Sequence, residues 1–129
     1  MRIHHIALWT RDLDAAARFW ADYFGARIGE RYESARRPGF ASRFVHLEGG
    51  AAVELMTGTW LAAAEPELER EGWAHIAVTV GTREAVQSLA GRLQAAGLLL
   101  SAPRLTGDGF YEAVARTPDG AVVEITATG

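Results

Sequence analysis

The sequence contains an internal duplication, and this feature constrains the fold more than any other. His-Ile-Ala-Leu at residues 5–8 reappears as His-Ile-Ala-Val at 75–78. Gly-Ala-Ala-Val-Glu-Leu at 50–55 reappears as Gly-Ala-Val-Val-Glu-Ile at 120–125. Each second copy lies 70 residues after the first, and two matches at one common offset are much harder to obtain by chance than either alone. The chain is therefore predicted to contain one small structural unit twice.

The length of the chain and the spacing of the repeat predict its organisation. With 129 residues, the chain suits a single domain over 1–129 that can bury a core without crosslinks. Within this domain the repeat predicts module one over 1–57, a connector over 58–71 and module two over 72–129.

Both modules show the same order of predicted elements. In module one, alternating apolar residues, capping residues and turn residues predict a strand, a helix and three strands at 3–9, 13–24, 26–34, 40–47 and 51–57. In module two they predict the same order at 74–80, 83–96, 98–105, 110–116 and 121–126. Two tandem βαβββ modules place the fold in the α+β class, with a mixed sheet and helices on one side of it.

Strand alternation separates two faces of the sheet. His5 and Glu54 share their faces with mostly small neighbours, and His75 and Glu124 do the same in module two. The opposite faces are branched-aliphatic, as is needed beneath packing helices. The His and Glu face is therefore predicted to line a cavity. His4 is expected to point away from His5 and to have a structural role.

These four residues predict a metal site formed by His5, Glu54, His75 and Glu124. A glutamate in the middle of a strand on an inward face is costly unless a cation or a proton accompanies it. Imidazole and carboxylate together suit Ni²⁺, Zn²⁺, Co²⁺, Mn²⁺ or Fe²⁺ rather than Ca²⁺ or Mg²⁺. One divalent ion with open positions could then bind a substrate. The alternative is a duplicated fold that keeps these residues and binds no metal.

Charge and composition exclude several other functions. The net charge is -3 and no Lys/Arg cluster forms a basic stripe, so nucleic acid is not an expected partner. No apolar run approaches the length of a membrane span, so no membrane association is expected. The chain has no cysteine, which excludes disulfides and thiolate ligands. Together with an N-terminus that lacks the apolar stretch of a signal peptide, this composition favours a cytoplasmic location.

The chain resembles the vicinal oxygen chelate superfamily, which includes glyoxalase I, methylmalonyl-CoA epimerase, extradiol dioxygenases and bleomycin resistance proteins. The resemblance rests on residues 5–8 followed by Asp12-Leu13, on Gly-Trp-Ala-His-Ile-Ala-Val at 72–78, and on Thr-Pro-Asp-Gly at 117–120 leading into Val-Glu at 123–124. The set of two His and two Glu in about 130 residues is most similar to small bacterial glyoxalase I-like metalloproteins.

The resemblance implies a cup-shaped, eight-stranded mixed sheet with helices on the outer face and the metal inside. It also implies a small-molecule substrate and, as in many members, a homodimer whose site can lie between subunits. The implied activity is that of a lyase or isomerase of glyoxalase I type. In this reaction a carboxylate moves a proton α to a metal-chelated carbonyl via an enediolate. Glu124 is the expected base, and Glu54 could share the roles of ligand and base.

The chain departs from glyoxalase I at the glutathione clamp. Glyoxalase I has an Arg four residues after its first His and an Asn four residues after its first Glu. Here these positions are Trp9 and Gly58, neither of which can grip a carboxylate. A more apolar or aromatic substrate end is therefore expected. The candidate substrate-binding residues are Trp9, Arg43, Tyr111 and Arg116.

Two alternative functions remain open within the same superfamily. A metal-dependent dioxygenase would typically have a second His where Glu54 stands. A non-enzymatic small-molecule binding or drug resistance protein would generally lack the metal ligands. The presence of all four His and Glu residues favours the enzyme.

Overall fold

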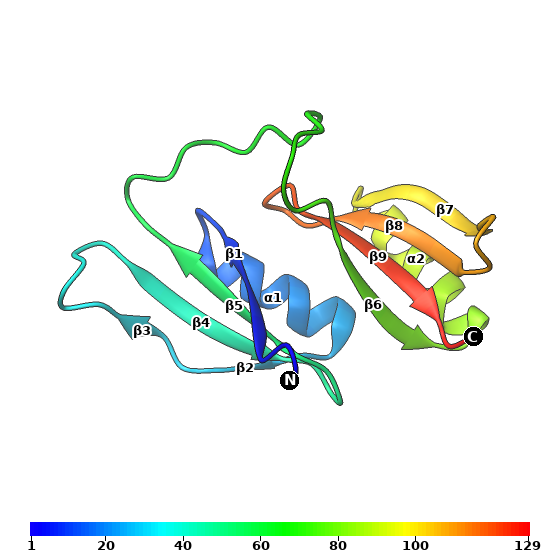
Figure 1. Cartoon of the computed structure of the whole chain (residues 1–129), viewed down its shortest axis with the longest axis horizontal. Coiled ribbons are helices and arrows are strands. Elements are labelled where there is room, and N and C mark those ends of the chain that lie inside the picture. The colour runs from blue at the N-terminus through cyan, green and yellow to red at the C-terminus, as the bar shows by residue number, and fades with distance from the viewer. The chain divides into compact units, whose positions relative to one another are not determined.

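The computed structural model describes residues 1–129 and divides them into two compact units, Met1–Ala64 and Glu65–Gly129 (Figure 1). The first unit contains β1 (His5–Trp9), α1 (Leu13–Phe24), β2 (Arg27–Ile28), β3 (Tyr32–Glu33), β4 (Ala41–His46) and β5 (Ala52–Thr57). The second unit contains β6 (Ile76–Gly81), α2 (Arg83–Ala95), β7 (Leu99–Leu105), β8 (Tyr111–Arg116) and β9 (Val122–Ala127). The α+β class and the tandem βαβββ order are thereby confirmed.

The two sheets share their topology. The first has the strand order β1-β5-β4-β2, with β3 also paired to β4, and the second has the order β6-β9-β8-β7. The pairs β1–β5 and β6–β9 are parallel, and the other pairs are antiparallel. Ala7 lies opposite Glu54 in one sheet, and Ala77 lies opposite Glu124 in the other. The offset of 70 residues found in the sequence therefore extends to the strand register.

Local side chains fix the ends of both helices as predicted. The Asp12 carboxylate accepts a hydrogen bond from the Ala15 amide at 2.9 Å, and the Thr82 hydroxyl accepts one from the Ala85 amide at 3.3 Å. Each bond satisfies an amide that has no partner within the helix. Gly25 adopts φ 63°, a left-handed conformation that glycine adopts without strain, and ends α1.

Each helix packs on one face of its own sheet (Figure 1). The buried residues of the first core are Leu13, Ala16, Ala17, Phe19, Trp20, Ala26, Ala41, Val45, Val53 and Leu55. Those of the second are Val86, Leu89, Ala90, Leu93, Ala113, Ala115, Val123 and Ile125. Phe24 is half-buried and Ala96 is exposed, because these residues lie at the ends of the helices. Neither α1 nor α2 has the length and apolar character needed to span a membrane.

The strand predicted over 26–34 is interrupted. Gly29 still donates its amide to the Phe44 carbonyl at 2.7 Å, but its own carbonyl accepts a hydrogen bond from the Arg43 side chain at 2.9 Å. A side chain therefore replaces the next backbone partner, and the segment divides into β2 and β3. The first sheet consequently has five strands and the second has four.

Candidate functional site

The sheet face opposite the helix in each unit, here called the ligand face, carries the predicted metal ligands. In β1, His5, Ala7 and Trp9 are exposed, whereas Ile6 and Leu8 are half-buried on the helix side. The strands β5 and β9 also bury their aliphatic residues on the helix side. The alternation predicted from the sequence is therefore present in the structure.

In the first unit, His5 and Glu54 form a close pair. The distance from His5 Nε2 to Glu54 Oε2 is 3.4 Å, and the side chains are 37% and 18% exposed. Glu54 lies between Ala7 of β1 and Phe44 of β4 in the sheet. The Phe44 ring also meets the His5 ring edge-on, with centroids 5.2 Å apart. The pair is thus partly shielded from solvent by its own unit.

In the second unit, His75 and Glu124 form the equivalent pair. The distance from His75 Nε2 to Glu124 Oε2 is 3.3 Å, and the side chains are 42% and 21% exposed. His75 directly precedes β6, and Glu124 lies in the middle of β9. The duplication therefore reproduces a side-chain contact as well as a backbone register.

His4 does not lie where alternation predicted. Its Nδ1 lies 2.8 Å from Nδ1 of His5, so the expectation that it points away from His5 is wrong. The reason is that β1 begins at His5, and the residue before a strand does not follow the strand's alternation. His5 thus has Glu54 at one ring nitrogen and His4 at the other. The equivalent position in the second unit is Ala74.

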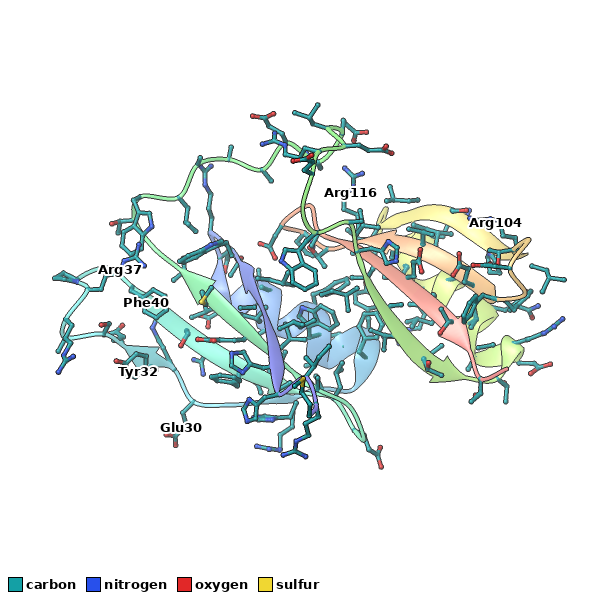
Figure 2. All side chains as sticks on the ribbon, viewed as in Figure 1. Glu30, Tyr32, Arg37, Phe40, Arg104 and Arg116 are labelled. Carbon is teal, nitrogen blue, oxygen red and sulfur yellow. The ribbon has the colours of Figure 1, made fainter.

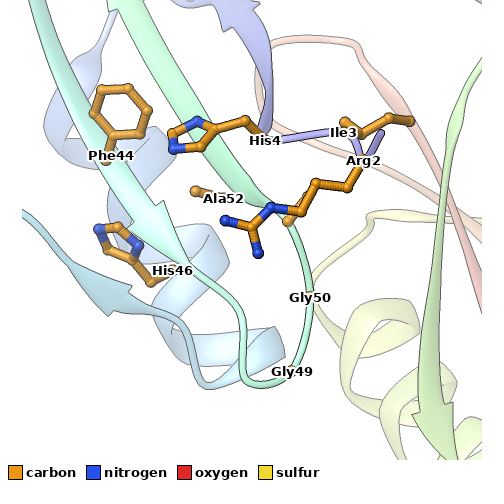
Figure 3. A pocket seen from close by; sticks show the side chains of 9 residues that line it. Arg2, Ile3, His4, Phe44, His46, Gly49, Gly50 and Ala52 are labelled. Atoms are coloured by element: carbon orange, nitrogen blue, oxygen red, sulfur yellow. The ribbon is translucent and has the colours of Figure 1, made fainter.

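A hollow of about 430 Å³ is lined in part by His4 and Phe44, two residues that contact His5 (Figure 3). Its lining includes the side chains of Arg2, His4, Phe44 and His46. The rings of Phe44 and His46 stack with centroids 6.3 Å apart. Since Phe44 also contacts His5, the hollow and this histidine share a neighbour on the ligand face.

Of the predicted substrate-binding residues, Trp9 and Arg116 lie on the ligand faces. The Trp9 side chain contacts the rings of two other aromatic residues of the first unit. Arg116 lies opposite Val122, on the same face as Glu124. Its Nη1 donates to Glu67 Oε1 at 3.0 Å, whereas its buried Nε has no hydrogen-bond partner.

The structure does not bring Arg43 and Tyr111 to the ligand faces. Arg43 donates to the Gly29 carbonyl, and its Nε lies 3.5 Å from Asp14 Oδ1 of α1. The Tyr111 hydroxyl accepts a hydrogen bond from Gln87 Nε2 of α2 at 2.9 Å. Both side chains therefore hold a helix on its sheet. Faces were predicted only for the four strands associated with His5, Glu54, His75 and Glu124, and β4 and β8 were not among them.

Glu112 is a buried carboxyl group that the sequence argument missed. It is 8% exposed and lies opposite Thr126, on the ligand face of the second unit. Burial raises the pKa of Glu112, and the nearby Glu124 carboxylate raises that pKa further; Arg104, with Nη2 3.9 Å from Glu112 Oε1, opposes the rise. Alternation along β8, which places Glu112 between two residues of the helix side, could have found it.

The donor atoms fit a divalent transition-metal ion. Two ligands bound to one such ion at 2.0–2.2 Å lie about 2.8–3.6 Å apart at octahedral or tetrahedral angles. The nitrogen–oxygen distances of 3.4 Å and 3.3 Å in the two pairs agree with that separation. In neither unit do three or more His, Asp or Glu side chains gather in a position to hold a metal. Each unit thus brings together two potential donors.

Fold and site together define a protein of two βαβββ units, each with one His–Glu pair on the open face of its sheet. A family model described as "Glyoxalase/Bleomycin resistance protein/Dioxygenase superfamily" matches residues 2–125. The chain belongs to this superfamily, which includes both enzymes and proteins without catalytic activity.

Similar solved structures share the fold. A glyoxylase/bleomycin resistance protein/dioxygenase domain from Frankia sp. EAN1pec has a TM-score of 0.84 at 18% identity, covering 100% of this chain and 93% of that one. The trypanothione-dependent glyoxalase I of Leishmania major has a TM-score of 0.77 at 18% identity, covering 98% and 86%. At these identities the similarity concerns the fold alone.

One similar curated protein is closer in sequence. "Uncharacterized protein PA2024" of Pseudomonas aeruginosa is 32% identical over 101 residues, which cover 78% of this chain and 69% of that protein. This relative supports the family assignment, and it carries no information about the substrate.

Proposed function

We propose that this chain is a metal-dependent enzyme of glyoxalase I type, a lyase or isomerase that acts on a small carbonyl compound. Its metal is one divalent ion of Ni, Zn, Co, Mn or Fe. The proposed ligands are His5, Glu54, His75 and Glu124. The observation that supports this most is the formation of the same His–Glu pair in both units, at the same register and with nearly the same separation.

The proposal requires both pairs to bind one ion. Two arrangements satisfy this requirement: all four ligands from one chain, or two from each of two chains in a homodimer. In either arrangement two imidazoles and two carboxylates form a borderline donor set, which suits the ions named above.

The chemistry of the proposed reaction is a proton transfer. When bound, the ion would act as a Lewis acid that acidifies the proton next to the substrate carbonyl. Glu124 is the proposed base, and it takes the proton from one carbon and returns it to the adjacent one. Glu112 sets the surroundings of Glu124 apart from those of Glu54, since it is a second carboxyl group beside Glu124, and burial and the charge of Glu124 raise its pKa. Glu54 has Phe44 and His5 as neighbours instead.

Metal analysis of the purified protein tests the proposal. Wild type should bind one ion per chain after dialysis against the divalent metals, and Glu54→Gln and Glu124→Gln should each lose most of that metal. Glu48→Gln, an exposed glutamate in the turn before β5, is the matched control and should bind metal like wild type. A wild-type protein that takes up no divalent ion would contradict the proposal.

Activity is tested next on metal-loaded protein. The first substrate is the hemithioacetal of methylglyoxal and glutathione, followed by hemithioacetals of other thiols and of aromatic α-ketoaldehydes. Exchange of the substrate proton with deuterated solvent, followed by NMR, detects proton abstraction even when turnover is slow. Metal binding without proton exchange on any of these compounds would contradict the proposed reaction but not the proposed metal site.

A further inference from the structure

An aromatic cluster occupies one end of the ligand face in the first unit. We define it by four residues: Trp9, Arg37, Phe40 and Trp60. Trp9 is the last residue of β1 and lies on the same face as His5, about 13 Å further along the strand. Phe40 directly precedes β4, and Arg37 lies beside it at the edge of the unit (Figure 2).

The rings of the cluster have an ordered arrangement. Trp9 meets Phe40 at 6.2 Å and Trp60 at 6.4 Å between centroids, with interplanar angles of 88° and 80°. The Arg37 Cζ lies 4.1 Å over the Trp60 ring. Edge-to-face rings and a guanidinium over an indole are favourable geometries, so these side chains fix one another. Even so, Trp9 remains 44% exposed and Trp60 43% exposed.

Gly58 makes the position of Trp60 feasible. A Cβ atom at residue 58 would lie only 2.5 Å from Cζ2 of the Trp60 indole. The indole thus occupies the space that any other side chain at this position would need. The loop is held on its other side by Arg11, whose Nη2 donates to the Leu61 carbonyl at 3.0 Å. The glycine is therefore part of how the cluster is built.

Arg37 brings a charge to the cluster that no carboxylate of the protein neutralises. The nearby Arg31 and Arg43 pair with Glu33 and Asp14, whereas Arg37 forms no ion pair. A guanidinium that contacts a ring through its face keeps its N–H donors free at its edge, where they can bind a carboxylate in bidentate fashion. A purely apolar partner would bury this charge without compensation, at a cost in free energy. The cluster therefore suits an anionic ligand.

We propose that the aromatic cluster binds the non-reacting end of the substrate, and that this end is a flat aromatic group bearing a carboxylate. Trp9 and Trp60 contact the ring, and Arg37 binds the carboxylate. The assignment of the cluster as a substrate site rests on the proposed function. It follows from the fact that the cluster lies on the same face as His5 and Glu54, two of the proposed metal ligands. Binding at the cluster itself requires no metal.

Calorimetric titration of EDTA-treated protein tests this proposal with 2-naphthoate as the probe. Wild type should bind 2-naphthoate more tightly than 2-naphthamide, which lacks the charge, and more tightly than cyclohexanecarboxylate, which lacks the ring. Trp60→Leu should weaken binding of 2-naphthoate about 3- to 10-fold, because one aromatic contact is lost. Arg37→Gln should weaken binding of 2-naphthoate by about 10-fold and that of 2-naphthamide much less, because the charged hydrogen bond is lost only with the carboxylate.

Matched controls and an indirect variant sharpen the test. Tyr32→Leu removes an exposed aromatic ring outside the cluster, and Arg36→Gln removes a neighbouring charge; both should bind 2-naphthoate like wild type. Gly58→Ala should displace the indole and weaken binding as much as Trp60→Leu does. Its thermal midpoint should stay close to that of wild type, since the far end of a side chain can move aside.

Three results would overturn the proposal. The first is equal affinity of wild type for 2-naphthoate and cyclohexanecarboxylate. The second is unchanged binding in both Trp60→Leu and Arg37→Gln. The third is absence of 2-naphthoate binding by wild type, together with a molecular mass of Trp60→Leu that differs from that of wild type by light scattering. That result would identify the cluster as a contact between copies of the chain. Metal content is measured separately and tests the proposed function, whereas the titration of EDTA-treated protein tests only binding at the cluster. Failure of one can therefore be distinguished from failure of the other.

Discussion

The two His–Glu pairs are alike in geometry and unlike in surroundings. His5 has a second histidine at its other ring nitrogen and an aromatic ring at its side. Glu124 shares its face with the buried Glu112, whereas the equivalent position in the first unit is Ser42. A duplicated scaffold has therefore acquired different groups around the same donor atoms. The resemblance to glyoxalase I is the reason for proposing Glu124 as the base, and this difference in surroundings is consistent with that proposal.

At the residue scale, Glu112→Gln should change the pH dependence of stability. The pKa of Glu112 lies above its usual 4.5 in the folded protein. The folded state thus binds this proton more tightly, and the stabilisation is present below pH 4.5 and lost as the pH rises through the raised pKa. The free energy of unfolding of wild type should therefore fall with rising pH relative to Glu112→Gln.

Urea unfolding of both proteins at a series of pH values, with EDTA present, measures this difference. All other carboxyl groups are common to the two proteins, so their contributions largely cancel. A difference in unfolding free energy that stays constant from pH 4 to pH 8 would contradict the raised pKa.

At the element scale, each unit is a helix fixed on a sheet by local caps and a buried apolar face. The caps at Asp12 and Thr82 stand at equivalent positions and make equivalent bonds. Side chains that hold a helix to its sheet, such as Arg43 and Tyr111, occupy the face opposite the ligands. The helix side therefore maintains the fold and leaves the other face free for chemistry.

Removal of the first cap should lower stability by a defined amount. Asp12→Ala should lower the free energy of unfolding by about 1 kcal/mol, because the Ala15 amide loses its acceptor. Asp12→Asn keeps an acceptor oxygen and should lie close to wild type. Chemical unfolding followed by circular dichroism measures both variants. Equal losses in the two would show that the charge of Asp12, rather than its hydrogen bond, stabilises α1.

At the scale of the whole molecule, the proposed metal needs one pair from each kind of unit. A complementation experiment distinguishes ligands from one chain and ligands from two. His5→Ala and His75→Ala should each lose the metal when purified alone. If two chains share each site, coexpression of the two variants restores one intact site in a mixed dimer, formed by the first unit of one chain and the second unit of the other.

Metal content and light scattering of the purified mixed dimer provide the measurement. One ion per mixed dimer indicates a site shared by two chains. No ion in the mixed dimer, with full binding by wild type, indicates a site within one chain. Full metal binding by either variant alone would contradict the assignment of the four ligands.

Much of the fold and part of the candidate site could be predicted from local patterns. Strand alternation has a period of two residues, so it places His5 and Glu54 on one face without knowledge of distant neighbours. Prediction from local patterns fails where contacts between distant parts of the chain determine the extent of a strand or the environment of a side chain. The Arg43 side chain interrupts the second strand, and Glu112 has a raised pKa only because neighbouring strands and Glu124 surround it.

The sequence by itself determined the duplication, because two matches at one offset can be read directly from it. It also determined the order of elements, the helix caps and the face that carries the two His–Glu pairs, because each of these depends on residues close together in the chain. The tertiary structure decided which side chains meet across the sheet. Trp9, Trp60 and the neighbouring residues Arg37 and Phe40 come from three separate segments, and pairing of β1 and β4 with β5 brings the ends of these segments together. The aromatic cluster follows from that pairing, and no single segment of the sequence encodes it.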